Sequence, residues 1–66
     1  MRNTLKVERA ILDITQDELA QRIGVSRQTI NSIEKNRYVP STLLSLKLSR
    51  EFGKSVNEFF SLENED

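Results

Sequence analysis

Apolar side chains recur along the chain at the three- and four-residue spacing of amphipathic helices. Glycine and proline divide this pattern into short segments, at Gly24, Pro40 and Gly53. The longest segments are about ten residues. The pattern therefore predicts an all-α domain of short helices.

The clearest helix boundaries lie in residues 15–26. The run Thr15-Gln16-Asp17-Glu18 is a capping box. In this motif the Thr15 hydroxyl accepts from the third helical N–H, and the Glu18 side chain accepts from the Thr15 N–H. A helix is therefore expected to begin at Gln16 and to end at Gly24, which can adopt the left-handed cap. Ser26 then offers an N-cap for a second helix after a very short turn.

The helix that follows Ser26 has an unusual outer face. Its apolar positions, Ile30 and Ile33, form only a narrow stripe. The outward positions carry hydrogen-bonding side chains in place of the usual mixture of Glu and Lys. They are Arg27, Gln28, Asn31, Ser32 and Lys35.

Three further helices are expected around this pair. One spans roughly ten residues from Leu5 to Ile14, and another begins after Ser41 and ends at Gly53. Ser55 is expected to cap a last short helix. The predicted core includes Leu5, Leu19, Ile30, Ile33, Leu43, Leu44, Leu46, Leu48, Phe52 and Phe59.

Composition excludes several kinds of site. The 66 residues contain no cysteine and no histidine, so disulfides and ordinary zinc sites are excluded. Without these residues no catalytic constellation is evident, and we expect no enzyme, metal or cofactor. No apolar stretch approaches a membrane span and no signal peptide is evident, so a cytoplasmic protein is expected.

Charge is unevenly distributed although the net charge is zero. All ten basic residues lie in positions 1–54 with six acids, whereas positions 55–66 hold only four acids. The body is thus +4 and the end of the chain −4. This division fits a modest basic face for nucleic acid, with Glu63–Asp66 as a frayed acidic tail.

The motifs resemble those of the Cro/Xre-type repressors, especially short stand-alone regulators similar to the cytolysin-operon repressor. The resemblance covers Asn3 to about Leu62. It implies a five-helix lambda-repressor-like DNA-binding domain, with room for a short pair of terminal β-strands. The motifs that carry it are Thr15-Gln16-Asp17-Glu18-Leu19-Ala20, Gly24-Val25-Ser26-Arg27-Gln28-Thr29-Ile30, Ile33-Glu34-Lys35 and Tyr38-Val39-Pro40-Ser41.

The resemblance also implies roles for individual residues. Arg27, Gln28 and Ser32 would read bases, and this agrees with the ability of Arg and Gln to contact guanine and adenine with two hydrogen bonds. Arg9 and Glu34 would form a partly buried ion pair. Glu8 departs from the family, where an apolar residue is common, so Val7 or Ile11 would take over its packing. The residues matching phosphate contacts are Gln16, Ser26, Thr29, Asn36, Arg37 and Tyr38.

The last helix carries more apolar surface than so short an element can bury. Some of it is therefore expected to face outward and form a homodimer interface, through Val56, Phe59, Phe60 and Leu62. The predicted organisation is a DNA-binding domain with a C-terminal dimerisation segment over residues 1–62, followed by the acidic tail 63–66. We expect a transcriptional regulator, a repressor, that binds an inverted-repeat operator. The alternative is an antitoxin-like or other protein-binding helix-turn-helix module.

Overall fold

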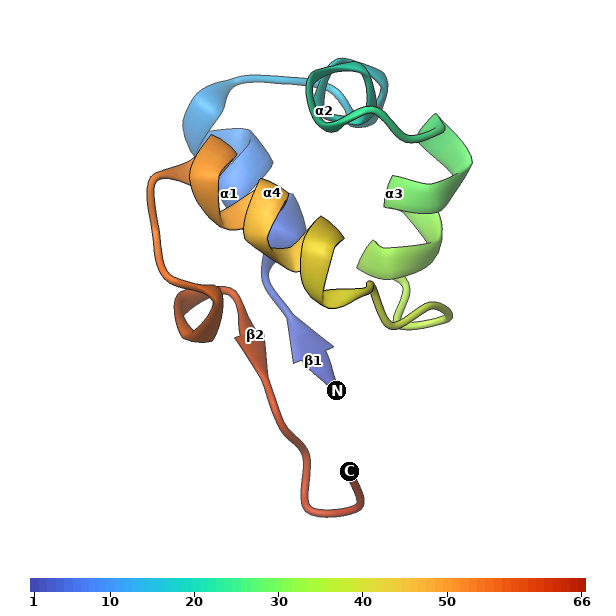
Figure 1. The fold of residues 1–66 in the computed structure, drawn as a ribbon, viewed down its shortest axis with the longest axis vertical. Coiled ribbons are helices and arrows are strands. Elements are labelled where there is room, and N and C mark those ends of the chain that lie inside the picture. The colour runs from blue at the N-terminus through green and yellow to red at the C-terminus, as the bar shows by residue number, and fades with distance from the viewer.

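A computed structural model describes all residues, 1–66, as four helices and a small terminal sheet (Figure 1). A short 3-10 turn, η1, separates the last helix from the second strand. The elements follow in the order β1 (Arg2–Asn3), α1 (Leu5–Leu12), α2 (Gln16–Ile23), α3 (Arg27–Glu34), α4 (Thr42–Phe52), η1 (Val56–Glu58) and β2 (Phe60–Ser61).

The predicted helix boundaries of the central elements are confirmed. Helix α2 begins after Thr15, whose hydroxyl accepts from the Glu18 N–H while Glu18 accepts from the Thr15 N–H, both at 3.0 Å. It ends at Gly24, with φ of 77°. Ser26 and Ser41 cap α3 and α4 in the same way, by accepting from the N–H three residues on.

The core is a single cluster of apolar side chains. Leu5 of α1, Leu19 of α2 and Ile30 of α3 are completely buried, as is Leu48 of α4. Phe59 closes the cluster, with its ring edge-on to Phe52 at 5.1 Å between centroids. The core therefore joins all four helices and holds α3 firmly on α2.

The predicted fifth helix is wrong. Ser55 does cap a turn, and Glu58 accepts from the Ser55 N–H at 2.7 Å, but the turn is 3-10 and holds three residues. The chain then extends into a strand, and Phe59 and Phe60 are both buried. Phe60 instead pairs with Asn3, so the terminal strand pair exists.

Several residues expected in the core lie on the surface. On α4 the buried side is formed by Leu44, Leu48 and Phe52, so Leu43 and Leu46 point the other way and are 66% and 57% exposed. The expectation for these two leucines was therefore wrong. Their helix has apolar residues on both faces, and spacing alone does not tell which face is covered.

Helix α1 also buries a different face from the one expected. Val7 and Ile11 are exposed, whereas Glu8 is buried. The Glu8 carboxylate is paired with the Lys54 ammonium at 2.9 Å, in the segment between α4 and η1. The charge is thus compensated across the interior, and neither Val7 nor Ile11 replaces the packing at this position.

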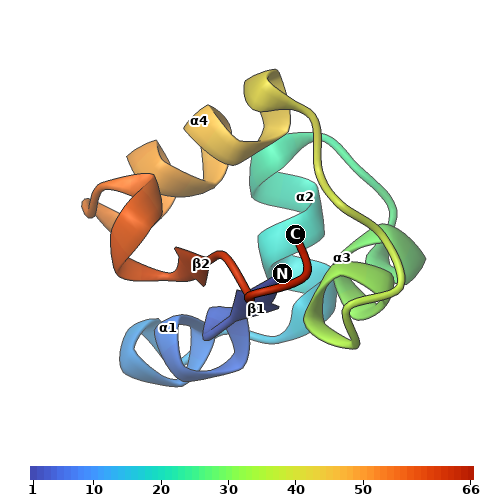
Figure 2. The same ribbon diagram turned by 90° about the horizontal axis from the view of Figure 1, so that it is seen from below.

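The two ends of the chain meet beside the strand pair (Figures 1 and 2). The Met1 ammonium lies 2.8 Å from one carboxylate oxygen of Asp66 and 3.4 Å from Glu63. The Glu63 N–H also donates to Asp66, so the acidic end folds back in a turn. In the structure the exposed acidic end thus lies against the N-terminal ammonium. No helix in the structure is long and apolar enough to cross a bilayer.

Candidate nucleic-acid interface

Helices α2 and α3 are joined by a three-residue turn that fixes their angle. Gly24 supplies a left-handed residue that no β-branched side chain could adopt without strain. The Val25 N–H then donates to the Ala20 carbonyl, which closes the end of α2. Ser26 starts α3 immediately afterwards. Figure 2 shows the two helices lying across each other, with α3 at the edge of the molecule.

The side of α3 away from the core is polar and open to solvent. Arg27, Gln28 and Lys35 are exposed, and Asn31 and Ser32 are half-buried. A shallow hollow runs along this side, lined by Ser26, Arg27, Gln28, Asn31 and Lys35. These side chains offer charge and hydrogen bonds on a ridge that can enter a groove.

A second hollow lies between α3 and the loop that follows it. The Ser26 and Thr29 hydroxyls are 2.9 Å apart there, so one hydrogen bond links them. Arg37 supplies the positive charge, and Tyr38 is 46% exposed. The hollow is lined by Ser26, Gln28, Thr29, Ser32, Arg37 and Tyr38. The structure thus brings four of the six predicted phosphate-contacting residues, Ser26, Thr29, Arg37 and Tyr38, to one hollow.

The loop after α3 is held in place from the N-terminus. Asn36 adopts a left-handed conformation, with φ of 59°. The Asn3 amide donates to Asn36 Oδ1 at 2.8 Å and to the Ile33 carbonyl at 2.9 Å. Asn3 was not among the predicted site residues. Only its place in the fold reveals this role, because 33 residues separate it from Asn36.

Arg9 and Glu34 lie face to face between α1 and α3. Arg9 Nε and one terminal nitrogen donate to the two Glu34 oxygens, at 2.6 and 3.0 Å. Arg9 also donates to the Ile14 carbonyl, and hydrogen bonding to Glu34 raises the pKa of its guanidinium. Both side chains are largely buried. The pair ties the first helix to the end of α3.

Gln16 is engaged inside the protein. Its Nε2 donates to Glu34 Oε1 at 3.1 Å and to Asn31 Oδ1 at 3.3 Å. Both hydrogens of the amide are therefore used to connect α2 with α3. Gln16 and Arg27 also line one hollow at the start of α2, with Arg9 on its wall.

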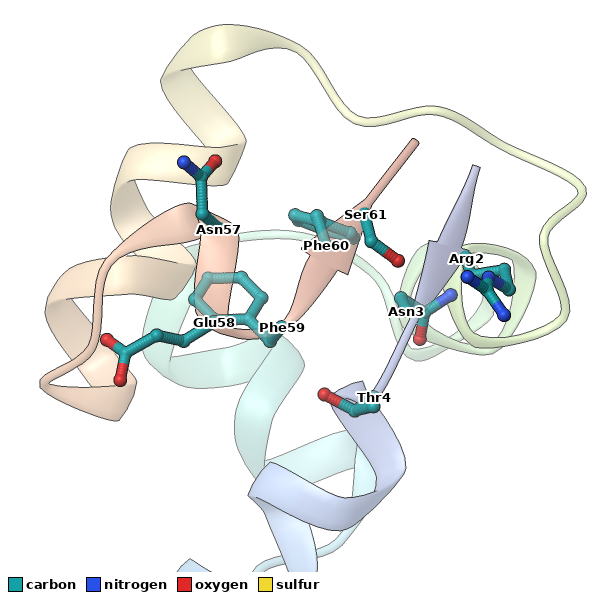
Figure 3. Close-up of a pocket in the computed structure, with 8 residues that line it drawn as sticks. All are labelled: Arg2, Asn3, Thr4, Asn57, Glu58, Phe59, Phe60 and Ser61. Atoms are coloured by element: carbon teal, nitrogen blue, oxygen red, sulfur yellow. The ribbon is translucent and has the colours of Figure 1, made fainter. Parts of the chain in front are cut away.

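The residues predicted for a dimer interface are divided by the fold. Phe59 and Phe60 are 2% and 6% exposed, so their expected outward surface is absent. Leu62 is exposed and Val56 is half-buried, and both line an apolar hollow with Met1 and Phe60. A separate, more polar hollow lies between the strand pair and η1 (Figure 3). In Figure 3, Asn3 and Thr4 line this hollow from the N-terminal side, and Phe60 and Ser61 line it from the C-terminal side.

Comparison with known proteins gives a consistent result. The family model described as Helix-turn-helix matches residues 5–59. An uncharacterized HTH-type transcriptional regulator of Methanocaldococcus jannaschii is 44% identical over 66 residues, covering all of both chains. The uncharacterized HTH-type regulator YgzD of Bacillus subtilis is 42% identical with the same full coverage. A regulator of Methanothermobacter thermautotrophicus is also 42% identical, over 96% of its length.

Proposed function

Because the chain belongs to the helix-turn-helix family of DNA-binding transcriptional regulators, we propose that it represses transcription as a homodimer on an inverted-repeat operator. The observation that carries this proposal is the polar outer face of α3, flanked by hollows on both sides. We propose a repressor role because the sequence motifs resemble those of short regulators similar to the cytolysin-operon repressor.

Base reading is assigned to the first turns of α3. Arg27 can donate two hydrogen bonds to guanine O6 and N7, and Gln28 can pair with adenine N6 and N7. Both side chains are exposed and free of partners within the protein. Ser32 lies about one turn beyond Gln28 and can add a single hydrogen bond.

Phosphates are assigned to the two flanks of α3. On one flank Arg37 and Tyr38 line the same hollow as the Ser26 and Thr29 hydroxyls, and Asn36 shapes the loop. On the other flank Gln16 begins α2, where the first backbone N–H groups lack partners within the helix and favour an anion. The flanks would thus hold the two strands that border the groove.

A dimer supplies the second half-site. The apolar hollow beside Leu62 and Val56 is the part of the predicted interface that remains open. A two-fold axis there would repeat α3 about 34 Å away on the same face of the duplex. The organisation proposed is therefore a DNA-binding body, a dimerisation surface at residues 56–62 and an acidic end, 63–66.

Selection of bound sequences from a random DNA pool tests this function. We expect an inverted repeat and an affinity that falls steeply as salt rises, since Arg and Lys displace counterions from phosphates. Arg27→Ala should remove the preference at one base pair per half-site, worth about 1–3 kcal/mol. Arg37→Ala is the matched control, because a lost phosphate contact should weaken binding to every sequence alike.

Two results would contradict the proposal. A wild-type protein that enriches no sequence would favour a protein-binding module over an operator-binding regulator. Arg27→Ala that leaves every base preference intact would show that α3 does not read bases in the proposed way.

A further inference from the structure

We propose that Asn31 reads the operator as a hydrogen-bond donor only, because its carbonyl oxygen faces α2 and accepts from Gln16. This inference rests on the proposed operator binding and adds a specificity rule to it. It assigns Gln16 a role as a positioning residue for base recognition, besides any contact of its backbone with a phosphate.

A chain of fixed donors and acceptors begins at Arg9. A guanidinium can only donate, and its two hydrogen bonds engage both oxygens of Glu34. The Glu34 carboxylate in turn can only accept. The Gln16 atom that lies 3.1 Å from Glu34 Oε1 is therefore the amide nitrogen.

The orientation of the Gln16 amide in turn fixes the orientation of the Asn31 amide. The second hydrogen of the Gln16 amide points at an Asn31 atom 3.3 Å away, which has to be an acceptor. That atom is Oδ1, so it faces α2. The planar amide then directs Nδ2, with its two hydrogens, away from the α2–α3 contact.

Asn31 lies where this polarity can be read. It is one turn beyond Arg27 and one turn before Lys35, and it lines the same open hollow on α3 as both. It is half-buried and makes no other side-chain hydrogen bond in the protein. Its amide nitrogen is therefore available to a base edge in the major groove.

The consequence is a change in the base that Asn31 favours. A free asparagine pairs with adenine because it accepts from N6 while it donates to N7. Here the accepting oxygen is held by Gln16, and turning it outward would break that hydrogen bond. Asn31 should instead favour base edges that present acceptors alone, which are guanine N7 and O6 or thymine O4. It should disfavour edges that carry an amino group, which are those of adenine and cytosine.

The test is sequence selection with wild type, Asn31→Ala and Gln16→Met. Asn31→Ala should erase the preference at one base pair per half-site and thereby identify the position that Asn31 reads. Wild type should carry guanine or thymine at that position. Gln16→Met releases Asn31 Oδ1, and it should shift the preference there toward adenine by about tenfold.

A second variant tests the inference even if thermal unfolding shows that Gln16→Met is poorly folded. Asn31→Asp can only accept, so it should favour cytosine or adenine at the same position. The inference fails if a selective wild type keeps all its preferences in Asn31→Ala, or if Gln16→Met weakens binding equally at all sequences. A wild type without any preference overturns the proposed function as well, so the two failures are distinct.

Discussion

Individual charges hold α1 in register with α3. Arg9 and Glu34 are largely shielded from water and make two hydrogen bonds to each other. Removing either partner leaves an uncompensated charge in a poorly solvated place. The pair therefore serves geometry more than net stability.

A double-mutant cycle on this pair should reveal strong coupling. We expect Arg9→Met and Glu34→Gln each to lower the free energy of unfolding, with an interaction energy of about 1–3 kcal/mol between them. Denaturant unfolding of wild type, both single variants and the double variant measures it. Additive effects would mean that the two side chains do not meet in solution.

Glu8 offers a contrasting buried charge. Its partner Lys54 is itself more than one third exposed, so the pair is only partly shielded. Lys54→Met should destabilise the protein by about 1–3 kcal/mol, because the buried carboxylate loses its partner. Glu8→Leu should be close to neutral, since apolar groups of similar volume often replace buried ions without loss. Thermal unfolding of the two variants separates these expectations; a strongly destabilised Glu8→Leu would contradict them.

Whether a single hydrogen bond can be predicted depends on how far apart its two residues lie in the sequence. The Thr15–Glu18 capping box joins residues three apart, so sequence alone indicates it. The hydrogen bonds of Gln16 to Asn31 and of Asn3 to Asn36 cross 15 and 33 residues. Their partners become evident only once the helices are packed, and neither contact could be read from spacing.

At the scale of elements, α4 shows which helical signals are unambiguous. Its start at Ser41 and its end at Gly53 follow from capping chemistry. Its buried face does not, because leucines occupy both sides of the helix. The same holds for η1, where the N-cap at Ser55 is evident from the sequence but the length of the turn, three residues, is not.

Two leucines of α4 provide a matched test of the packing. Leu48 is completely buried and Leu46 is 57% exposed, although both occupy the middle of the same helix. Leu48→Ala should cost about 2–5 kcal/mol of unfolding free energy, from lost burial and the cavity left behind. Leu46→Ala should cost well under about 1 kcal/mol. Similar losses in chemical denaturation would show that the assigned face of α4 is wrong.

The whole molecule is closed by the contact between its ends. Hydrogen bonding to Asp66 raises the pKa of the Met1 ammonium above its ordinary value of 8.0, and the same contact lowers the pKa of Asp66 below 3.8. The ammonium contributes stability below pH 8 and loses it as the pH rises through its raised pKa. Asp66 contributes above about pH 4 and loses it as the pH falls through its lowered pKa.

The stabilisation by this contact should therefore be greatest between about pH 4 and pH 8, and it should be lost as the pH moves past either shifted pKa. Asp66→Asn should lower the thermal midpoint inside this window and match wild type well outside it. Glu65→Gln is the control, since Glu65 makes no contact with Met1. A difference between wild type and Asp66→Asn that persists unchanged at pH 2 would rule out this origin.

The last prediction concerns assembly, where the fold narrows the surface available. With Phe59 and Phe60 inside the core, the proposed dimer contact is limited to Leu62 and Val56 around the apolar hollow. A monomer this small makes few contacts with one half-site, so pairing two copies is what gives a tight, symmetric operator site. Leu62→Glu places a charge on that surface. In sedimentation at protein concentrations of roughly tens of micromolar, it should shift the protein from dimer to monomer. Ile11→Glu is the matched control, because Ile11 is also an exposed apolar residue, 63% against 77%, but lies on α1. A monomeric wild type would contradict the proposed dimer, and dissociation by Ile11→Glu but not by Leu62→Glu would place the two-fold axis elsewhere.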